Sequence, residues 1–335
     1  MVLQNTSLKN LNTFGIDVKA KYFSRFDTIE ELSTIFREHS GIEFLILGGG
    51  SNLLLTQDFD GLVLRNEIIG KSIVEESENT VLVKIGAGEN WHEFVLWALE
   101  NDFGGIENMS LIPGSVGASP MQNIGAYGVE IKDVFNHLLA YHIETGETHR
   151  FSLEECQFGY RESVFKRGLK NKYVIAEVCF RLEKNRKVNT TYGAIKQELE
   201  KNGISSPTIR DVSNAVIAIR QSKLPNPAEL GNAGSFFKNP VVEESIADDL
   251  VKKYPEAPVY PAENGKKKLA AGWLIEQAGW KGKTVGTCGV HKLQALVLVN
   301  YGGSTGQQIY DLSTAIISDV QSKFGVTLER EVNIL

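Results

Sequence analysis

The sequence predicts an α+β protein with more than one domain. At 335 residues the chain can form two or three domains, each with its own apolar core. Helical and extended patterns alternate over the first seventy residues. Beyond about Ser205 the pattern is mainly helical, with a strand expected at Gln294–Asn300 between two helices.

The first unit is predicted from a capped helix followed by two strands. Thr28 and Glu31 have the spacing of a capping box, in which each side chain accepts a hydrogen bond from the other's backbone amide. The apolar residues that follow recur at helical spacing, and Gly41 is expected to end the helix. Strands are then expected at 44–47, which leads into a glycine-rich loop from Gly48 to Asn52, and at 61–64.

The middle of the chain alternates strands with glycine-rich loops. Val81, Val83 and Ile85 alternate as in a half-buried strand, and Asn90 is placed to cap a helix in which Glu93 completes the capping box. A stretch poor in helix signals runs from Gly104 to Gly128. Further strands are expected at 134–143, 148–152 and 173–182.

The last third is expected to hold two amphipathic helices and a terminal strand. Apolar residues at helical spacing mark one helix around 212–219 and another over 309–320 that ends at Gly325. The segment 326–335 alternates strictly between apolar and polar residues. Its polar face carries both Glu329 and Glu331.

Composition excludes several classes of protein. The formal net charge is −6, which argues against a nucleic-acid-binding face. No apolar run reaches the roughly 20 residues needed to span a bilayer, and the first fifteen residues lack the apolar core of a secretory signal. Three cysteines far apart in sequence, together with scattered histidines, argue against a disulfide framework and a metal site and favour a reducing, cytoplasmic compartment.

Two glycine-rich segments are candidates for cradling an anionic ligand. Each follows a strand, and glycine lets backbone amides approach a phosphate closely. Gly48–Asn52 lacks the third glycine of a dinucleotide-binding turn, and a segment of this kind taken alone is more often a tight turn than a phosphate site. The segment Leu111–Gly128 is longer and nearly uncharged. It favours a buried loop around a large polar ligand of nucleotide type.

Polar residues in the second half suggest further binding functions. Arg161 follows Tyr160 and could bind a carboxylate, although a surface ion pair is the alternative. Arg220 and Lys223 share a helix face, where they could clamp a diphosphate or complement the helix dipole. Ser235 has no histidine nearby in sequence that could make it a nucleophile, which leaves a proton donor as its open role.

Seven motifs in order resemble the UDP-N-acetylenolpyruvoylglucosamine reductases along nearly the whole chain. They are Asn12–Ile16, Gly48–Asn52, Gly86–Asn90, Leu111–Gly128, Phe158–Arg161, Gly231–Pro240 and Leu328–Val332. Their common order makes the resemblance far more specific than any single motif. An oxidase of the same flavin fold and a non-catalytic protein that binds nucleotide sugars are the alternatives.

The resemblance implies three domains, and a monomer is expected. A pair of domains, 1–70 and 71–224, would hold non-covalent FAD as in flavoproteins of the vanillyl-alcohol-oxidase type, with segment 326–335 joining the second of them. Residues 225–325 would form the α+β substrate domain. The implied flavin-binding residues are Gly48, Gly49, Gly50, Ser51, Asn52, Leu53, Pro113, Gly114, Ser115, Gly117, Ala118, Ser119, Gln122, Asn123, Gly125, Ala126 and Tyr127.

The resemblance also implies the chemistry. NADPH would reduce the flavin, and the flavin would then reduce UDP-N-acetylglucosamine enolpyruvate to UDP-N-acetylmuramate for peptidoglycan synthesis, which serves cell wall biogenesis, cell shape and division. Arg161 and Glu331 would stabilise the enolate, and Ser235 would protonate it. Glu329 competes with Glu331, and the family motif selects Glu331.

Six more residues match family positions that contact the substrate or the nicotinamide nucleotide. Tyr192 matches the tyrosine of the subtype whose loop covers the substrate. The full implied set is Tyr160, Tyr192, Arg220, Lys223, Asn239 and Gln294.

Overall fold

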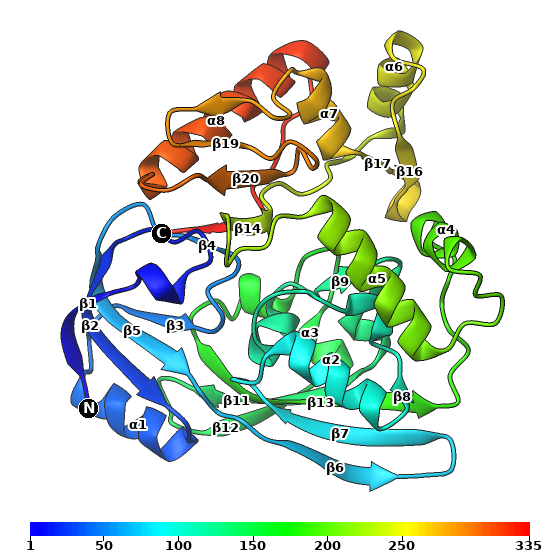
Figure 1. Cartoon of the computed structure of the whole chain (residues 1–335). Helices are drawn as coiled ribbons and strands as arrows, with labels where there is room; N and C mark the ends of the chain where they lie inside the picture. Colours follow the sequence, from blue (N-terminus) through cyan, green and yellow to red (C-terminus); the bar gives the residue numbers. More distant parts are fainter. The chain divides into compact units, whose positions relative to one another are not determined.

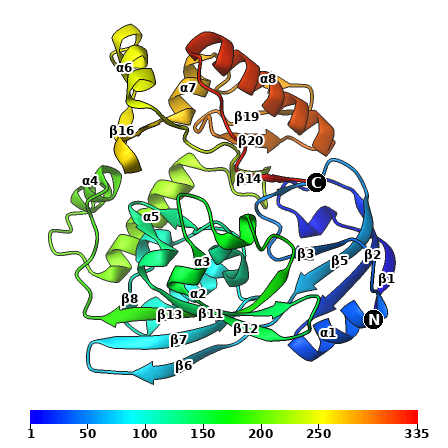
Figure 2. The same cartoon turned by 180° about the vertical axis from the view of Figure 1, so that it is seen from behind.

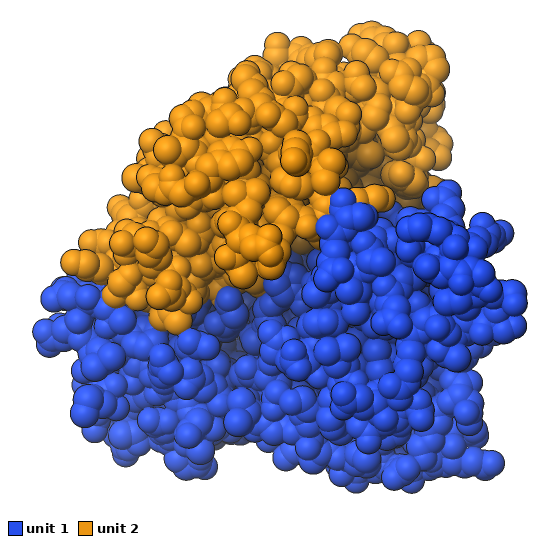
Figure 3. Space-filling model, viewed as in Figure 1, with its two compact units in different colours: residues 1–6, 20–49, 60–222 blue, residues 7–19, 50–59, 223–335 orange.

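The computed structural model describes all residues from 1 to 335, which form two compact units (Figure 3). Unit 1 comprises Met1–Thr6, Ala20–Gly49 and Asp60–Ser222. Unit 2 comprises Ser7–Lys19, Gly50–Phe59 and Lys223–Leu335. Two short segments near the N-terminus therefore belong with the last third of the chain.

Unit 1 contains a four-stranded sheet covered by one helix. The strand order is β1 (Leu3–Ser7), β2 (Lys19–Phe26), β5 (Phe59–Asn66) and β3 (Phe44–Leu47), and β3 runs parallel to β5. Helix α1 (Ile29–Glu38) buries Leu32 and Ile35 against this sheet. Thr28 caps α1 as expected, but the Glu31 carboxylate accepts from the amide of Asp27, and the helix ends before Gly41.

The second sheet of unit 1 is larger and carries most of the core. Its strands follow the order β12 (Thr148–Ser152), β11 (Phe135–His142), β13 (Tyr173–Lys184), β7 (Thr80–Gly86) and β6 (Lys71–Glu76), and β8 (Phe103–Gly104) also pairs with β13. Helix α2 (Trp91–Glu100) begins at its Asn90 cap. Trp91 of α2 packs edge-on against Phe180 of β13, and Phe94 packs against the same ring at a tilt. Helix α2 and strand β13 are both labelled in Figure 1.

Three further helices complete unit 1. Helix α3 (Leu153–Cys156) follows β12 and has a full capping box. Helices α4 (Gly193–Lys201) and α5 (Ile209–Lys223) share a separate small core. Both helices are seen from behind in Figure 2. The apolar stripe expected around 212–219 is the buried face of α5.

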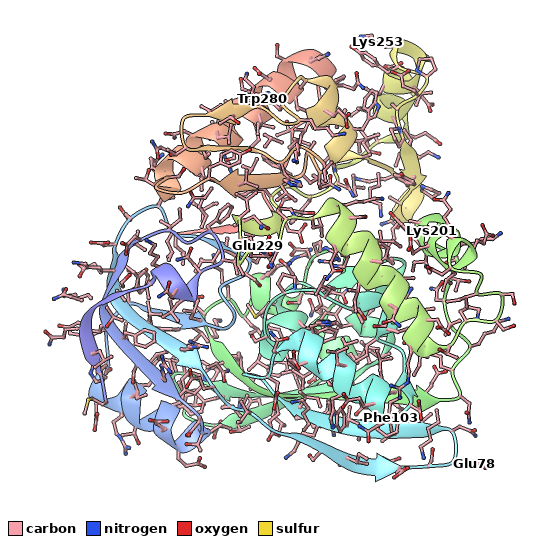
Figure 4. The ribbon with its side chains drawn as sticks, in the orientation of Figure 1. Glu78, Phe103, Lys201, Glu229, Lys253 and Trp280 are labelled. Carbon is pink, nitrogen blue, oxygen red and sulfur yellow. The ribbon has the colours of Figure 1, made fainter.

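Unit 2 is built on a four-stranded antiparallel sheet. Its order is β14 (Gly231–Ser235), β20 (Val297–Asn300), β19 (Cys288–Val290) and β18 (Thr284–Val285). Helices α7 (Ala271–Gln277) and α8 (Gly306–Phe324) accompany this sheet, and α8 ends at Gly325 in the left-handed conformation, as expected. Trp280, labelled in Figure 4, follows α7 and donates to Asp319 of α8.

A smaller sheet and the C-terminus complete unit 2. Strands β15 (Val241–Val242), β17 (Lys267–Leu269) and β16 (Val259–Pro261) form a three-stranded sheet with α6 (Glu244–Lys253) between β15 and β16 in sequence. No helix in the chain combines the length and the apolar character needed to cross a membrane.

The C-terminal segment differs from the expected long strand. Only β21 (Asn333–Ile334) is a regular strand, and it runs parallel to β4 (Leu53–Leu54). Shortly before β21, the backbone of Arg330 forms an isolated antiparallel β-bridge with that of Phe237. The segment changes partners along its length, so it cannot continue as one strand. The segment belongs to unit 2. The three-domain division itself remains a prediction.

Candidate active site

Two glycine-rich loops of unit 1 meet at a distance that excludes side chains. Gly48 and Gly49 follow β3 and face Gly114 and Ser115. A Cβ atom on Gly49 would lie 2.8 Å from the Cα of Gly114, and one on Gly48 would lie 2.3 Å from the Oγ of Ser115. Real Cβ contacts are longer, so both positions require glycine while the loops keep this spacing.

The loop at Gly114 is tied to the start of α2. The amide of Trp91 donates to the carbonyl of Gly114 over 3.0 Å, and the amide of Val116 donates to the carbonyl of Glu89 over 2.8 Å. Asn90, the cap of α2, forms a backbone bridge with Ser115. The second glycine-rich segment is therefore anchored on the same residues that begin the helix.

A cavity of about 490 Å³ opens beside these loops. Its volume lies within the range of small-molecule sites. Its wall combines bare backbone with charged groups, among them Glu67, which pairs with Arg25 at 3.3 Å and with Arg65 at 3.1 Å. A glycine cradle of this kind fits the phosphates of a dinucleotide cofactor. The lining residues are Asp27, Gly48, Gly49, Arg65, Asn66, Glu67, Ile69, Gly88, Asn90, Gly114 and Ser115.

The predicted flavin-binding residues are distributed over both units. Gly48, Gly49, Gly114 and Ser115 line the cavity, while Gly50, Ser51, Asn52 and Leu53 follow in sequence but belong to unit 2. The rest continue the long loop of unit 1, namely Pro113, Gly117, Ala118, Ser119, Gln122, Asn123, Gly125, Ala126 and Tyr127.

Asn123 shapes the long loop from within. It is fully buried and lies in the left-handed region with φ 46°. Its amide nitrogen donates to Glu130 over 2.9 Å and to the carbonyl of Gly159 over 3.2 Å, and its side-chain oxygen accepts from the amide of Lys132. This side chain therefore holds the loop together, whatever part it has in binding.

Arg161 is fastened to the same loop. Its Nη2 donates to the carbonyl of Gly125 over 2.8 Å and its Nη1 to that of Asn123 over 3.4 Å, while Glu130 lies 4.0 Å away. The side chain is only 19% exposed, and its backbone has φ 55°. The backbone carbonyls of the loop orient the guanidinium. A guanidinium is a group that can bind a carboxylate through two parallel hydrogen bonds.

A second cationic group of unit 1, Arg220, contacts one of two tyrosines whose rings pack together. Arg220 of α5 hydrogen-bonds with the hydroxyl of Tyr127, and its Nε is buried without a partner. Burial lowers the pKa of Arg220 and raises the pKa of Tyr127. The ring of Tyr127 meets that of Tyr192 edge-on at 5.1 Å, and Tyr192, at the start of α4, is 49% exposed.

Unit 2 brings Ser235 and Glu331 together. The amide of Glu331 donates to the carbonyl of Phe236 over 2.8 Å, directly after Ser235 at the end of β14. Two residues earlier in the C-terminal segment, Glu329 is exposed and forms an ion pair with the buried ammonium of Lys238. The two carboxylates differ in exposure, because Glu331 is half-buried whereas Glu329 is exposed.

The remaining predicted residues lie at the edges of these groups. Asn239 accepts from the amide of Ala271 at the start of α7 over 2.9 Å, and Gln294 accepts from the amide of Leu296. Lys223 lies exposed at the end of α5. The guanidinium carbon of Arg161 lies over the ring of Tyr160, 5.5 Å from the ring centre.

Buried polar residues with no predicted role were missed by sequence reasoning. Lys238, Asn108, Asn300 and His291 are each buried. Asn12 belongs to the motif Asn12–Ile16, for which the sequence predicts no function of its own. Buried polar residues need partners, so a polar residue amid apolar ones was the available signal. Burial itself cannot be read from spacing.

A larger cavity, of about 870 Å³, lies in unit 2. The turn from Asn12 to Ile16 and the glycine-rich segment Gly302–Gly306 form much of its wall. Its lining carries charges of both signs and no buried, unpartnered polar atom, so it does not define a ligand.

Comparison with known proteins identifies the family. The family model for the C-terminal domain of UDP-N-acetylenolpyruvoylglucosamine reductase matches residues 226–335, and a FAD binding domain model matches 20–152. The reductase of that name from Flavobacterium johnsoniae is 55% identical over the whole chain and 99% of its own length. That of Pseudomonas putida is 50% identical, covering 99% of this chain and 98% of its own length.

A solved structure shares the fold. The UDP-N-acetylenolpyruvylglucosamine reductase from Thermus caldophilus matches all of this chain and 98% of its own with a TM-score of 0.69 at 22% identity. The predicted fold class, a FAD-binding pair of the vanillyl-alcohol-oxidase type with an α+β substrate domain, is confirmed. With relatives this similar over its entire length, the chain belongs to the UDP-N-acetylenolpyruvoylglucosamine reductase family.

Proposed function

We propose that Arg161, Ser235 and Glu331 carry the chemistry of this reductase. The enzyme uses NADPH and FAD to reduce UDP-N-acetylglucosamine enolpyruvate to UDP-N-acetylmuramate in peptidoglycan synthesis. FAD, when bound, would pass on to the substrate the hydride that it receives from NADPH. Reduction of the double bond also requires a proton donor and a group that stabilises negative charge on the substrate, and this chain must supply both.

The pairing of Glu331 with Phe236 is the observation that carries this assignment. It brings two distant parts of the sequence together, because the backbone of Glu331 is hydrogen-bonded to the residue that follows Ser235. Ser235 is half-buried at the end of β14, and its small side chain suits a donor close to a reacting carbon. A hydroxyl is a weak acid, so it protonates only a strongly basic intermediate in a preorganised site.

Glu331 is proposed to stabilise the enolate by donating a hydrogen bond. An ionised carboxylate would oppose the negative charge that develops on the enolate, whereas a protonated one can donate a hydrogen bond to it. Glu329 is not proposed for this role because its charge is balanced by Lys238 and its side chain is 71% exposed.

Arg161 stabilises the substrate carboxylate as the enolate forms. Its guanidinium is held by two backbone carbonyls of the long loop and needs little reorganisation to act. Stabilisation of this kind grows as charge develops, and so it favours the transition state over the bound substrate.

The remaining predicted contacts are proposed as binding groups. Arg220, whose Nε is buried without a partner, supports a site for the diphosphate, and Tyr192 above Tyr127 supports the subtype with a substrate-covering tyrosine. Tyr160, Lys223, Asn239 and Gln294 are proposed to complete the substrate and nicotinamide nucleotide site. The residues of the two glycine-rich segments, with those after them as far as Leu53 and Tyr127, are proposed to bind FAD.

The cellular setting is proposed from the state of the cysteines. The three cysteines are free and buried, which suits a reducing compartment. We propose a monomer in the cytoplasm, divided into two FAD-binding domains and a substrate domain.

The two half-reactions can be tested separately through the flavin absorbance. NADPH added without oxygen to the FAD-loaded protein should bleach the flavin band, and UDP-N-acetylglucosamine enolpyruvate should then restore it. In the variant Ser235→Ala, NADPH should reduce the flavin at the normal rate, but reoxidation of the flavin by the sugar nucleotide should be slower by on the order of 100-fold or more. The exposed Ser245, on α6 of the same unit, provides a matched control as Ser245→Ala. Normal reoxidation of Ser235→Ala would remove Ser235 from the mechanism.

A further inference from the structure

We propose that Asn12 is a positioning residue that fixes the Gly50 loop of the flavin site relative to the strand carrying Ser235. This inference rests on the proposed role of Ser235 as the proton donor. Asn12 does not contact the reacting atoms in this scheme. It acts through the turn from Asn12 to Ile16, hereafter the brace.

The side chain of Asn12 determines the shape of the brace. It is 7% exposed and makes three hydrogen bonds within its own segment. The amide nitrogen donates to the carbonyls of Leu8 over 2.7 Å and Ile16 over 2.9 Å, and the side-chain oxygen accepts from the amide of Ile16 over 3.0 Å. These bonds close the turn and set the orientation of the peptide groups of Thr13 and Phe14.

One side of the brace holds the flavin loop. The amide of Thr13 donates to the carbonyl of Gly50 over 3.1 Å. The contact is tight, because a Cβ on Gly50 would lie 2.0 Å from the carbonyl oxygen of Leu11. Gly50 also lies in the left-handed region, with φ 62°, where glycine is favoured. The loop cannot shift toward the brace.

The other side of the brace holds the strand of the proton donor. The carbonyl of Thr13 accepts from the amide of Asn232 over 3.0 Å, three residues before Ser235. The carbonyl of Phe14 accepts from the side chain of Asn300 over 2.9 Å and would lie 2.3 Å from a Cβ on Gly231. The ring of Phe14 also meets that of Phe236 at 6.1 Å.

Thr13 is therefore a two-sided junction. Its N–H is bonded to the flavin loop and its C=O to the strand of Ser235, so one peptide orientation sets the spacing of both. A further link closes the arrangement, since Asn52 donates to the carbonyl of Glu331 over 3.3 Å. Loss of the Asn12 side chain frees the junction to rotate and displaces Ser235 from the place that protonation requires.

The two half-reactions distinguish this role from simple destabilisation. Reduction by NADPH does not use Ser235, whereas reoxidation by the enolpyruvyl sugar nucleotide does. A displacement of about 1 Å can slow a reaction on the order of 100-fold. Asn12→Ala should therefore slow reoxidation by about 10- to 100-fold and leave flavin reduction within about 3-fold of the native rate.

A solvent isotope effect provides a readout that general loosening would not change. If proton delivery becomes slow, reoxidation of Asn12→Ala in D₂O should show a larger isotope effect than the native enzyme. Asn12→Asp offers a graded rescue, because only its protonated carboxyl can both donate and accept in the turn. Its reoxidation rate, relative to native, should recover as the pH falls.

Two further variants keep the test decisive if Asn12→Ala does not fold. Gly231→Ala perturbs the same junction from the strand side and should give the same pattern. Asn10→Ala is the matched control, because Asn10 is exposed beside the turn and outside the proposed machinery. Equal slowing of both half-reactions, or an unchanged solvent isotope effect, would overturn the proposal. If the native enzyme itself were not reoxidised by the sugar nucleotide, the proposed function would fail, and not the brace.

Discussion

The contact between the two glycine-rich loops of unit 1 allows the loss of FAD affinity to be predicted for variants in which a glycine gains a single methyl group. In Gly49→Ala the new Cβ would lie 2.8 Å from the Cα of Gly114 and 3.2 Å from its carbonyl carbon. Carbon atoms normally approach to about 3.5 Å, so the loops must separate by roughly 0.7 Å. Both obstructing atoms are backbone, and no side chain can rotate out of the way.

The separation should mainly affect binding. Without cofactor the loops can relax apart, but FAD requires the native spacing, and overpacking of this kind costs about 1–3 kcal/mol. Since about 1.4 kcal/mol is a tenfold change in affinity, the FAD dissociation constant should rise about 5- to 150-fold. Flavin fluorescence titration of the apoprotein measures this directly. Gly168→Ala is the matched control, because a Cβ there meets nothing within 4 Å.

The neighbouring glycine should behave differently. A Cβ on Gly48 would lie 2.3 Å from the Oγ of Ser115, but 3.4 Å from its Cβ. The hydroxyl alone causes the clash, so Ser115→Ala should restore part of the FAD affinity lost in Gly48→Ala, and it should not rescue Gly49→Ala. Native affinity in Gly49→Ala, or equal rescue of both variants, would refute the assignment of this cradle to FAD.

Two predictions follow from the pKa directions. Burial raises the pKa of Cys156 to about 12 and that of Cys179 to about 11, and it also raises the pKa of Cys288. None of these thiols should therefore react with iodoacetamide at pH 8 until the protein unfolds. Mass spectrometry of the treated protein would detect any alkylation. Burial lowers the pKa of His92, whose Nδ1 accepts from the amide of Leu111. Because the folded pKa lies below the unfolded value of 6.5, this contribution to stability is present above pH 6.5 and is lost as the pH falls below it. Thermal midpoints should show a smaller loss between pH 6.5 and 5.5 in His92→Gln than in the native protein.

Helices with local start and stop signals were predictable from sequence. Thr28 and Asn90 each accept from the amide three residues later, and Gly325 ends α8 in the left-handed conformation. These signals depend only on nearby residues. The reciprocal bond of Glu31 went instead to Asp27, because two adjacent amides were open to one carboxylate and spacing cannot choose between them.

The organisation of the units was not predictable in the same way. Residues 7–19 and 50–59 pair with parts of the chain more than two hundred residues away, such as Thr13 with Asn232 and Thr56 with Leu335. Nothing in their composition marks that destination. Strands β2 and β6 also escaped prediction, β6 because it is mostly exposed and lacks a clear alternating apolar face.

The candidate site shows the same division between residue type and placement. Motif order could select Arg161, Ser235 and Glu331, but it could not explain why Glu331 differs from Glu329 on what was expected to be the same face. Lys238 supplies the physical reason. A buried ammonium is costly without a counter-charge, and the exposed Glu329 provides one. The same lysine pairs with Glu329, whereas the backbone of Glu331 is hydrogen-bonded to the residue after Ser235, so it is Glu331 that lies beside the proposed proton donor in the fold. If so, Lys238→Met should free Glu329 without transferring the role to it, because Glu329 remains two residues from the backbone bond that places Glu331.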